Sequence, residues 1–219
     1  SSLGKESLTD VKLGDQVEKI VTVLFTDIRD FTALSEQMTP QENFRFVSSF
    51  NECLGPVIRM HHGFINQYLG DSIMAIFPGN PEDALNAAIE MQKAVFEFNK
   101  KRESNGLPAI KAGIGMHTGP LIMGITGDEH RLDAATISDT VNTAARIESL
   151  TKFYKSPLLL SGDTLRYIDG QDRFHVRHLG NVRLKGKHKV LTIFECIDGH
   201  EQKELDKKIE NLENIWHIL

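Results

Sequence analysis

Two aspartates stand where a strand and a tight turn would bring carboxylates together. Asp27 follows an apolar, β-branched run at residues 21–25, which is typical of a buried strand. Asp71 lies in the short segment 69–72 between two further strand candidates, which predicts an antiparallel hairpin. If this hairpin lies beside the first strand, both carboxylates and the Ile28 carbonyl reach one sheet edge and suit Mg²⁺. The alternative is that Asp27 caps a helix and Asp71 is an ordinary turn residue.

Basic and amide side chains farther along the chain could hold phosphate groups. Asn142 and Arg146 are four residues apart on a predicted helix, so they share one face. Arginine offers a planar fork for phosphate oxygens, and asparagine offers a neutral donor. The run Arg-Leu-Lys-Gly-Lys-His-Lys at 183–189 lies between strand candidates and could clamp a polyphosphate. The alternatives are a solvated helix face for the pair and a turn kept soluble by lysines for the run.

The composition narrows the class of protein. The chain has 219 residues, enough for one sizeable domain with flanks. Its 25 basic and 30 acidic side chains give a net charge of −5, which argues against a general nucleic-acid binder. Cys53 and Cys196 form no CxxC motif, which suits a reducing compartment rather than a disulfide scaffold or a zinc ribbon. No apolar run approaches the roughly 18 residues that span a bilayer.

Helix and strand signals alternate along the chain. Thr39 and Glu42 form a capping box before a first helix, and Asn80 followed by Pro81 begins a second. The expected helices cover 40–63, 81–106 and 139–150, and the expected strands 21–25, 64–68, 73–77, 110–116, 121–125, 158–160, 174–179 and 190–197, with a turn at 118–120. The apolar stripe expected on the first helix comprises Phe44, Val47, Phe50, Leu54, Val57 and Ile58.

The order β-α-β-β-α-β predicts an α+β fold. Its core is ferredoxin-like, an antiparallel sheet with helices on one face, extended by extra strands and helices. Residues 1–20 are expected to form a linker, 21–198 the main domain and 199–219 a C-terminal helix. Arg29 and Asp30 are expected to make surface contacts only.

Five segments in this order resemble the class III adenylyl/guanylyl cyclase catalytic domain of bacterial sensor cyclases. The resemblance spans about residues 20–198, and the combination of motifs is highly specific. The segment Leu-Gly-Asp at 13–15 also resembles the transducer element that precedes this domain, which implies an upstream sensor domain. The motifs are VTVLFTDIRDFT at 21–32, YLGDSIMAIF at 68–77, GIGMHTG at 113–119, ISDTVNTAARIE at 137–148 and Leu-Lys-Gly at 184–186.

The resemblance implies an adenylate cyclase that converts ATP to 3′,5′-cyclic AMP and pyrophosphate with two Mg²⁺ or Mn²⁺ ions. Asp27 and Asp71 match the family's metal-binding aspartates. Asn142 matches the residue that orients the ribose, Arg146 the one that stabilises charge at the α-phosphate, and Lys185 the one that holds the terminal phosphates. In this family the two aspartates and the Asn/Arg pair meet across a head-to-tail dimer interface, so we expect a homodimer with two sites.

The residues that would read the base depart from the family's patterns. Gln67 stands where adenylyl members typically carry lysine and guanylyl members glutamate, and Ala135 stands where adenylyl members carry Asp or Thr. A glutamine amide both donates and accepts, whereas alanine adds no hydrogen bond; Thr136 could substitute if the loop shifts. We therefore expect ATP to be favoured with relaxed selectivity that admits GTP.

Three other functions compete with an adenylate cyclase. A guanylyl cyclase differs only in its base, and a catalytically silent cyclase-homology module would bind nucleotide and signal through dimerisation. A diguanylate cyclase on a related fold lacks support, because the hairpin reads Tyr-Leu-Gly-Asp rather than a GGDEF-like turn. The nucleotide substrate and the unpaired thiols imply a cytoplasmic domain. The full-length protein could still be tethered to a membrane.

Overall fold

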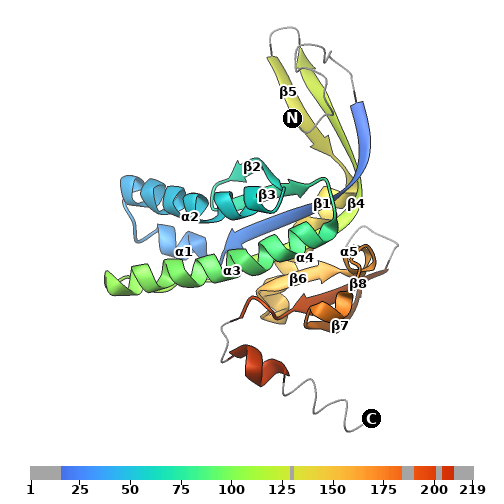
Figure 1. The fold of residues 1–219 in the computed structure, drawn as a ribbon. Coiled ribbons are helices and arrows are strands. Elements are labelled where there is room, and N and C mark those ends of the chain that lie inside the picture. The colour runs from blue at the N-terminus through green and yellow to red at the C-terminus, as the bar shows by residue number, and fades with distance from the viewer. Residues whose placement is uncertain (1–15, 129–130, 184–189, 201–203, 210–219) are drawn as a thin grey trace.

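The computed structural model describes residues 16–128, 131–183, 190–200 and 204–209, with the backbone alone for 16–17, 123–128 and 131–137. The chain forms one eight-stranded sheet in the order β2-β3-β1-β4-β6-β8-β7, with β5 paired to β4 (Figure 1). The strands are β1 (Gln16–Ile28), β2 (Phe64–Leu69), β3 (Ser72–Phe77), β4 (Ala112–Asp128), β5 (Arg131–Ile137), β6 (Leu158–Ser161), β7 (Val176–Arg183) and β8 (Val190–Cys196).

The predicted α+β fold with its βαββαβ core is confirmed, with one refinement of the sheet. Neighbouring strands are antiparallel except β4 and β6, which pair in parallel through Ile114–Leu158 to Met116–Leu160. A parallel pair needs a crossover connection, and α4 (Asp139–Tyr154) provides part of it. The sheet is therefore mixed rather than wholly antiparallel.

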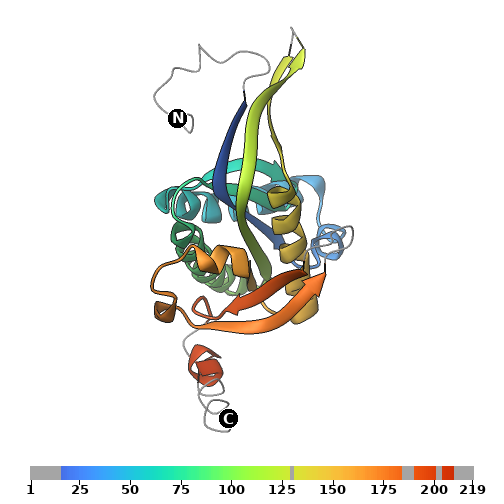
Figure 2. The ribbon, with the colours of Figure 1, turned by 90° about the vertical axis from the view of Figure 1, so that its right-hand side faces the viewer.

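The two central strands are longer than the sequence indicated. β1 begins at Gln16, five residues before the expected strand, and pairs with β4 along its whole length from Gln16–Gly124 to Ile28–Ala112. The turn expected at 118–120 is wrong, because β4 runs straight through Gly119 and Pro120. β5 was not expected at all. Its pairing with β4 forms an arm that projects beyond the body of the molecule (Figures 1 and 2).

Two long helices cover one face of the sheet. α2 (Pro40–Met60) begins with the predicted Thr39 capping box, and α3 (Pro81–Ser104) with the predicted Asn80 cap. Their buried side chains pack with β1 residues Leu24 and Ile28 in the largest core cluster. The stripe expected on the first helix is wrong at Phe44, which is 74% exposed. The rest of the stripe is confirmed, because Phe50, Leu54 and Ile58 are fully buried and Val47 and Val57 pack partly buried against the core. Phe46 is buried in place of Phe44.

α4 packs on the other face of the sheet. Its Ala144 lies in a second cluster with Val21, Val23 and Phe25, which alternate along β1 with the residues that face α2 and α3. The expectation of helices on one face alone is therefore corrected. α4 also extends to Tyr154, one turn beyond the predicted end.

Short elements complete the described chain. They are α1 (Phe31–Ser35), α5 (Gly162–Arg166), the 3₁₀ turn η2 (Gln171–Arg173) and a helical segment at 204–209. Only that segment of the helix predicted at 199–219 lies among the residues described as helical, and 201–203 and 210–219 lie outside the description. Within the described residues, no helix combines the length and apolar character needed to cross a bilayer.

Candidate active site

The first strand and the hairpin bring Asp27 and Asp71 together, as predicted. β1 pairs with β3 in a register that places Thr26 opposite Ile73, so the turn before β3 lies beside the end of β1. The Ser72 hydroxyl donates a 3.0 Å hydrogen bond to the Thr26 carbonyl and fixes this contact. The turn has two residues, and its first, Gly70, adopts φ 66°, a conformation that glycine reaches without strain.

The electrostatics of this pair favour an added cation. The Asp27 and Asp71 carboxyl groups hydrogen-bond to one another, and burial together with that bond and the nearby charges of Asp71 and Glu148 raises the pKa of Asp27 to about 8, against an opposing effect of Arg29. The Asp27 Oδ1 atom is buried and has no hydrogen-bond partner among the described residues. A divalent cation bound here would offset the negative charges around Asp27 and would give its Oδ1 atom a partner.

The oxygen donors present fit a magnesium-type ion. Asp27 and Asp71 offer carboxylates, and Ile28, the last residue of β1, follows Asp27 directly in the chain. Among the described residues, no group of three or more His, Cys, Asp or Glu side chains is placed to hold a metal. Two carboxylates with a backbone carbonyl leave further positions for phosphate oxygens and water, which is the ligand set of a nucleotide-bound Mg²⁺.

A buried ion pair connects this site to α4. The Arg29 guanidinium lies 3.5 Å from Glu148 Oε1, with side chains 19% and 10% exposed, and also donates to the Thr151 hydroxyl. The expectation that Arg29 makes only surface contacts is therefore wrong. The same expectation is confirmed for Asp30, which forms an exposed 3.1 Å ion pair with Lys152.

Two glycines let α4 approach the sheet closely enough for this pair. A Cβ atom on Gly115 would overlap the backbone of Glu148, and one on Gly113 would lie 2.6 Å from the Glu148 carboxylate. The sequence contained this signal, because Gly113 and Gly115 alternate along a strand facing one side. The roles of Arg29 and Glu148 were not predicted from the sequence.

Asn142 and Arg146 lie on an exposed face of α4, as their spacing predicted. The helix begins at the Ser138 cap, whose side chain accepts from the Val141 backbone N–H. Both side chains are exposed, and neither is among the groups that shift the pKa of Asp27. The charged groups that do so are Asp71, Glu148 and Arg29.

The expected base-reading residues lie on strands far apart in the sheet. Gln67 is exposed on β2, directly after a bulge at Asn66 that breaks the side-chain alternation. Ala135 and Thr136 lie on β5 opposite Gly124 and Met123 of β4. Since β3, β1 and β4 separate β2 from β5, one chain does not bring these positions together. Lys185 lies outside the described residues.

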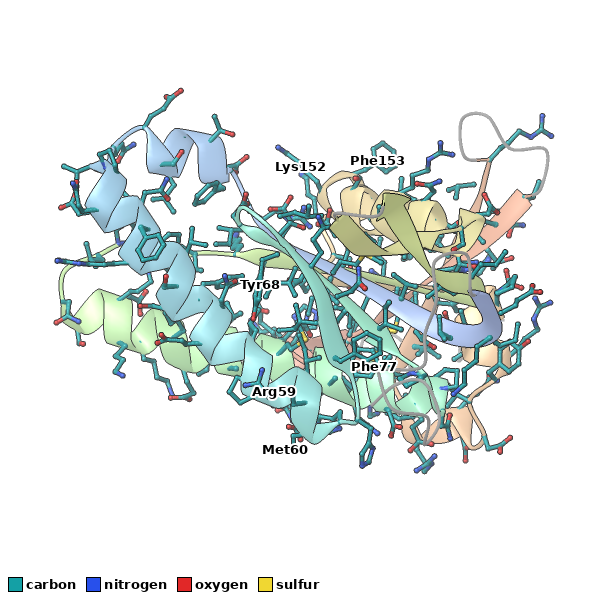
Figure 3. All side chains as sticks on the ribbon, turned by 90° about the horizontal axis from the view of Figure 1, so that it is seen from above. Arg59, Met60, Tyr68, Phe77, Lys152 and Phe153 are labelled. Atoms are coloured by element: carbon teal, nitrogen blue, oxygen red, sulfur yellow. The ribbon has the colours of Figure 1, made fainter. Side chains whose placement is uncertain are left out.

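Apolar side chains are exposed beside this site. Tyr68 and Leu69, at the end of β2, are 50% and 45% exposed, and Phe153 near the end of α4 is 77% exposed (Figure 3). Exposed apolar groups of this size often mark an interaction surface.

Comparison with known proteins agrees with this geometry. Residues 14–195 match the sequence model of the family described as adenylate and guanylate cyclase catalytic domain. An adenylate cyclase of Anabaena cylindrica is 39% identical over 201 residues, 89% of this chain and 40% of that protein. Adenylate cyclase 1 of Rhizobium meliloti is 33% identical over 183 residues, 81% of this chain and 27% of that protein. The chain thus spans less than half the length of these relatives.

Solved structures share the fold. The guanylyl cyclase Cya2 aligns with a TM-score of 0.73 and 30% identity, covering 84% of this chain and 94% of that one. The adenylyl cyclase CyaB from P. aeruginosa aligns with a TM-score of 0.74 and 26% identity, covering 86% and 98%. The sequence match, these relatives and the aspartate pair at the sheet edge lead to one conclusion: the chain belongs to the adenylate and guanylate cyclase catalytic domain family.

Proposed function

We propose that this domain converts ATP to 3′,5′-cyclic AMP and pyrophosphate. The observation that carries the proposal is the hydrogen-bonded Asp27–Asp71 pair, with the buried Asp27 Oδ1 lacking a partner. In the reaction, the ribose 3′-oxygen bonds to the α-phosphorus while the bond from that phosphorus to the pyrophosphate oxygen breaks. The 3′-hydroxyl proton passes to water or to the substrate, since no residue here is assigned as a base.

Asp27, Asp71 and the Ile28 carbonyl would hold two Mg²⁺ or Mn²⁺ ions. When bound, these ions activate the 3′-hydroxyl and neutralise charge on the triphosphate. The carboxylates contribute by fixing oxygen donors at one edge of the sheet, where β1 and the β2–β3 hairpin meet. Arg29 contributes by pairing with Glu148 at 3.5 Å, which limits the negative charge next to Asp27.

Asn142 and Arg146 would act on the nucleotide held by a second copy of the chain. Asn142 would orient the ribose, Arg146 would stabilise the charge that develops at the α-phosphate, and Lys185 would hold the terminal phosphates. A head-to-tail homodimer is supported by the exposure of Asn142 and Arg146 and by the exposed apolar side chains of Tyr68 and Phe153. The separation of Gln67 from Ala135 within one chain supports it too.

The same arrangement supports relaxed base selectivity. In the dimer, Gln67 of one chain would face Ala135 and Thr136 of the other. A glutamine amide can present its donor to adenine or its acceptor to guanine, and alanine does not discriminate. We therefore propose ATP as the preferred substrate with measurable use of GTP.

The longer protein would carry a sensor upstream of this domain. The relatives are more than twice as long as the matched region, which leaves room for such a part. A cytoplasmic site of action follows from the nucleotide substrate, and tethering to a membrane would depend on the rest of that protein.

The test is a paired assay on the purified domain at high concentration. ATP or GTP is supplied with Mg²⁺ or Mn²⁺, and the cyclic product is identified by mass. Asp27→Ala is the blank, and Asp30→Asn, which changes an exposed carboxylate next to the site, is the matched control. Cyclic AMP from ATP, retained in the control and lost in the blank, is the expected result.

The second candidate is a silent module that binds nucleotide without turnover. Ala135, which removes a hydrogen bond at the base position, favours it. Nucleotide binding by a dimer with no cyclic product from ATP or GTP would replace the enzyme proposal by this one. Cyclic GTP from GTP alone would instead establish a guanylyl cyclase.

A further inference from the structure

We propose that the domain binds a small organic anion with an apolar body, such as an aryl carboxylate or sulfonate, in a cavity at the end of β1 and the start of β4. The cavity has a volume of about 630 Å³, within the range of small-molecule sites. It lies between α3, the start of β4 and the end of α4, and Gly199, His200, Glu204 and Lys208 also line it. The proposal concerns binding and does not depend on the cyclase reaction.

The lining of this cavity includes neither Asp27 nor Asp71, although Arg29 lines it. Thr26 lines it, whereas the next residue, Asp27, belongs to the carboxylate pair. Successive side chains of a strand point to opposite faces, so Thr26 faces the α3 side with Leu24 and Ile28 while Asp27 faces the α4 side. The cavity extends past the end of β1, where Arg29 and the α4 residues Thr151 and Lys152 also line it.

The floor of the cavity is apolar but holds two polar groups that have no hydrogen-bond partner among the described residues. Leu54, Met91 and Ile114 form part of the apolar floor. Thr26 is fully buried, and its hydroxyl has no hydrogen-bond partner in the described part of the chain. The same is true of both the oxygen and the nitrogen of the Gln92 side-chain amide. Because buried polar groups are normally paired, a ligand that bonds to them would gain more than apolar contact.

The rim of the cavity carries more positive than negative charge. Five Lys and Arg side chains line it against two carboxylates, Asp30 and Glu204. Three of the five are paired, as Arg29–Glu148, Lys152–Asp30 and Lys208–Glu195. The other two, Lys111 and Lys155, have no carboxylate partner among the described residues. An apolar floor below two available ammonium groups favours an amphiphilic anion over a bare inorganic ion or a cation.

The ligand would lie close to Arg29, which also contacts α4, the helix that carries Asn142 and Arg146. Arg29 lines the cavity and pairs with Glu148 of α4, two residues from Arg146. An anion near Arg29 would compete with Glu148 for the guanidinium.

The test uses 8-anilinonaphthalene-1-sulfonate as the probe and the uncharged N-phenyl-1-naphthylamine as its matched control. Binding is followed by fluorescence and by methyl NMR of the labelled methionines. Met91 lines this cavity, whereas Met38 lines a different one between α1, α2 and α3. We expect saturable binding of the sulfonate that shifts the Met91 methyl signal and leaves Met38 unchanged, with at least tenfold weaker binding of the uncharged probe.

Variants then test the two features of the site. Lys111→Glu with Lys155→Glu should weaken sulfonate binding at least tenfold, while Lys93→Glu on the exposed side of α3 should leave the Kd within about twofold. Gln92→Met, which keeps the side-chain length, should weaken binding severalfold. Absence of saturable binding, a shift at Met38 rather than Met91, equal affinity for both probes, or an unchanged Kd in the double variant would each overturn the proposal. Unchanged methyl spectra of the unliganded variants establish that they are folded.

Discussion

Two carboxylate sites in this domain are buried, and they differ in how the chain offsets the free-energy cost of burying a negative charge. Glu195 on β8 has a side chain that is 1% exposed and lies between Arg177 and Lys208, with Lys208 Nζ at 3.1 Å. Burial by itself would raise the pKa of Glu195, but the hydrogen bonds from Lys208 and Ser156 and the charges of Lys208 and Arg177 lower it. Arg177 and Lys208 thus offset the negative charge of Glu195 and stabilise it in its buried position.

The charge of the Asp27–Asp71 pair at the end of β1 is not offset by cationic side chains in this way. The Asp27 carboxyl group is hydrogen-bonded to a second carboxyl group, that of Asp71. The cation that acts on its pKa, Arg29, is already paired with Glu148. Burial and the neighbouring carboxylates raise its pKa to about 8. From this contrast we infer that Glu195 serves the fold, whereas the uncompensated Asp27–Asp71 pair is the proposed site of an external cation.

The largest expected effect is on activity. Asp27→Asn should lower the cyclase rate by about 10³-fold or more, because it removes a carboxylate that holds the metal ions. Glu195→Gln should leave the rate within roughly threefold, because its charge is used within the fold. Steady-state production of cyclic AMP measures both. A comparable loss in the two variants would remove the distinction between the sites.

A smaller effect tests whether the missing cation comes from a second chain. Arg146→Ala should lower the rate by about 10²-fold. Mixing Arg146→Ala with Asp27→Asn should then restore up to about one quarter of wild-type activity, because half of the dimers formed at random carry one intact site out of two. Mixing Arg146→Ala with Asn142→Ala serves as the control, since both changes fall on the same half-site. No recovery in the first mixture would contradict the head-to-tail arrangement.

Stability should change in opposite directions at the two sites. Without metal at pH 7.5, Asp27→Asn should raise the Tm by roughly 2–6 °C, because the buried Asp27, with a pKa of about 8, takes up a proton on folding that the unfolded chain does not hold at this pH, and Asn avoids that cost. Glu195→Gln should lower the Tm by roughly 2–8 °C. Glu97→Gln, in an exposed pair with Lys100, should shift the Tm by no more than about 1 °C.

Calorimetry with and without Mg²⁺ checks these changes. Added Mg²⁺ should stabilise the wild type and leave Asp27→Asn unaffected, because only the former binds the ion. Destabilisation by Asp27→Asn in the absence of metal would show that Asp27 serves the fold as Glu195 does.

The smallest effect concerns pH. The pKa of Glu195 is lowered below its ordinary value of 4.5, so its ion pairs stabilise the folded state above that pH and lose their contribution as the pH falls through the folded-state pKa. The gap in unfolding free energy between wild type and Glu195→Gln should be full at pH 7 and 6 and should shrink below pH 4.5. Urea unfolding at each pH measures it. A gap that stays constant down to pH 4 would mean that Glu195 acts through packing rather than charge.

Local signals in the sequence located much of the fold. The Thr39 capping box, the Asn80 cap and the Gly70 turn were predictable because each depends on residues close together in the chain. The same holds for the shared face of Asn142 and Arg146. Phe44 was misassigned because an apolar residue at helical spacing still needs a neighbouring surface to be buried.

Asp27, Asp71 and the motifs around them were sufficient to identify the family from the sequence, and the proposed metal and nucleotide binding depends on these side-chain types at these positions. Only the tertiary structure decided that β4 continues through Pro120 to form an arm with β5, that Arg29 pairs with Glu148, and that Thr26 and Gln92 meet over a cavity. β5 follows β4 closely in the chain, but the arm is also held by the pairing of β1 with β4, for example Gln16 with Gly124. This pairing, the Arg29–Glu148 pair and the cavity all bring together residues more than 60 positions apart. No local pattern encodes them, because their free energy comes from packing and pairing of the whole sheet.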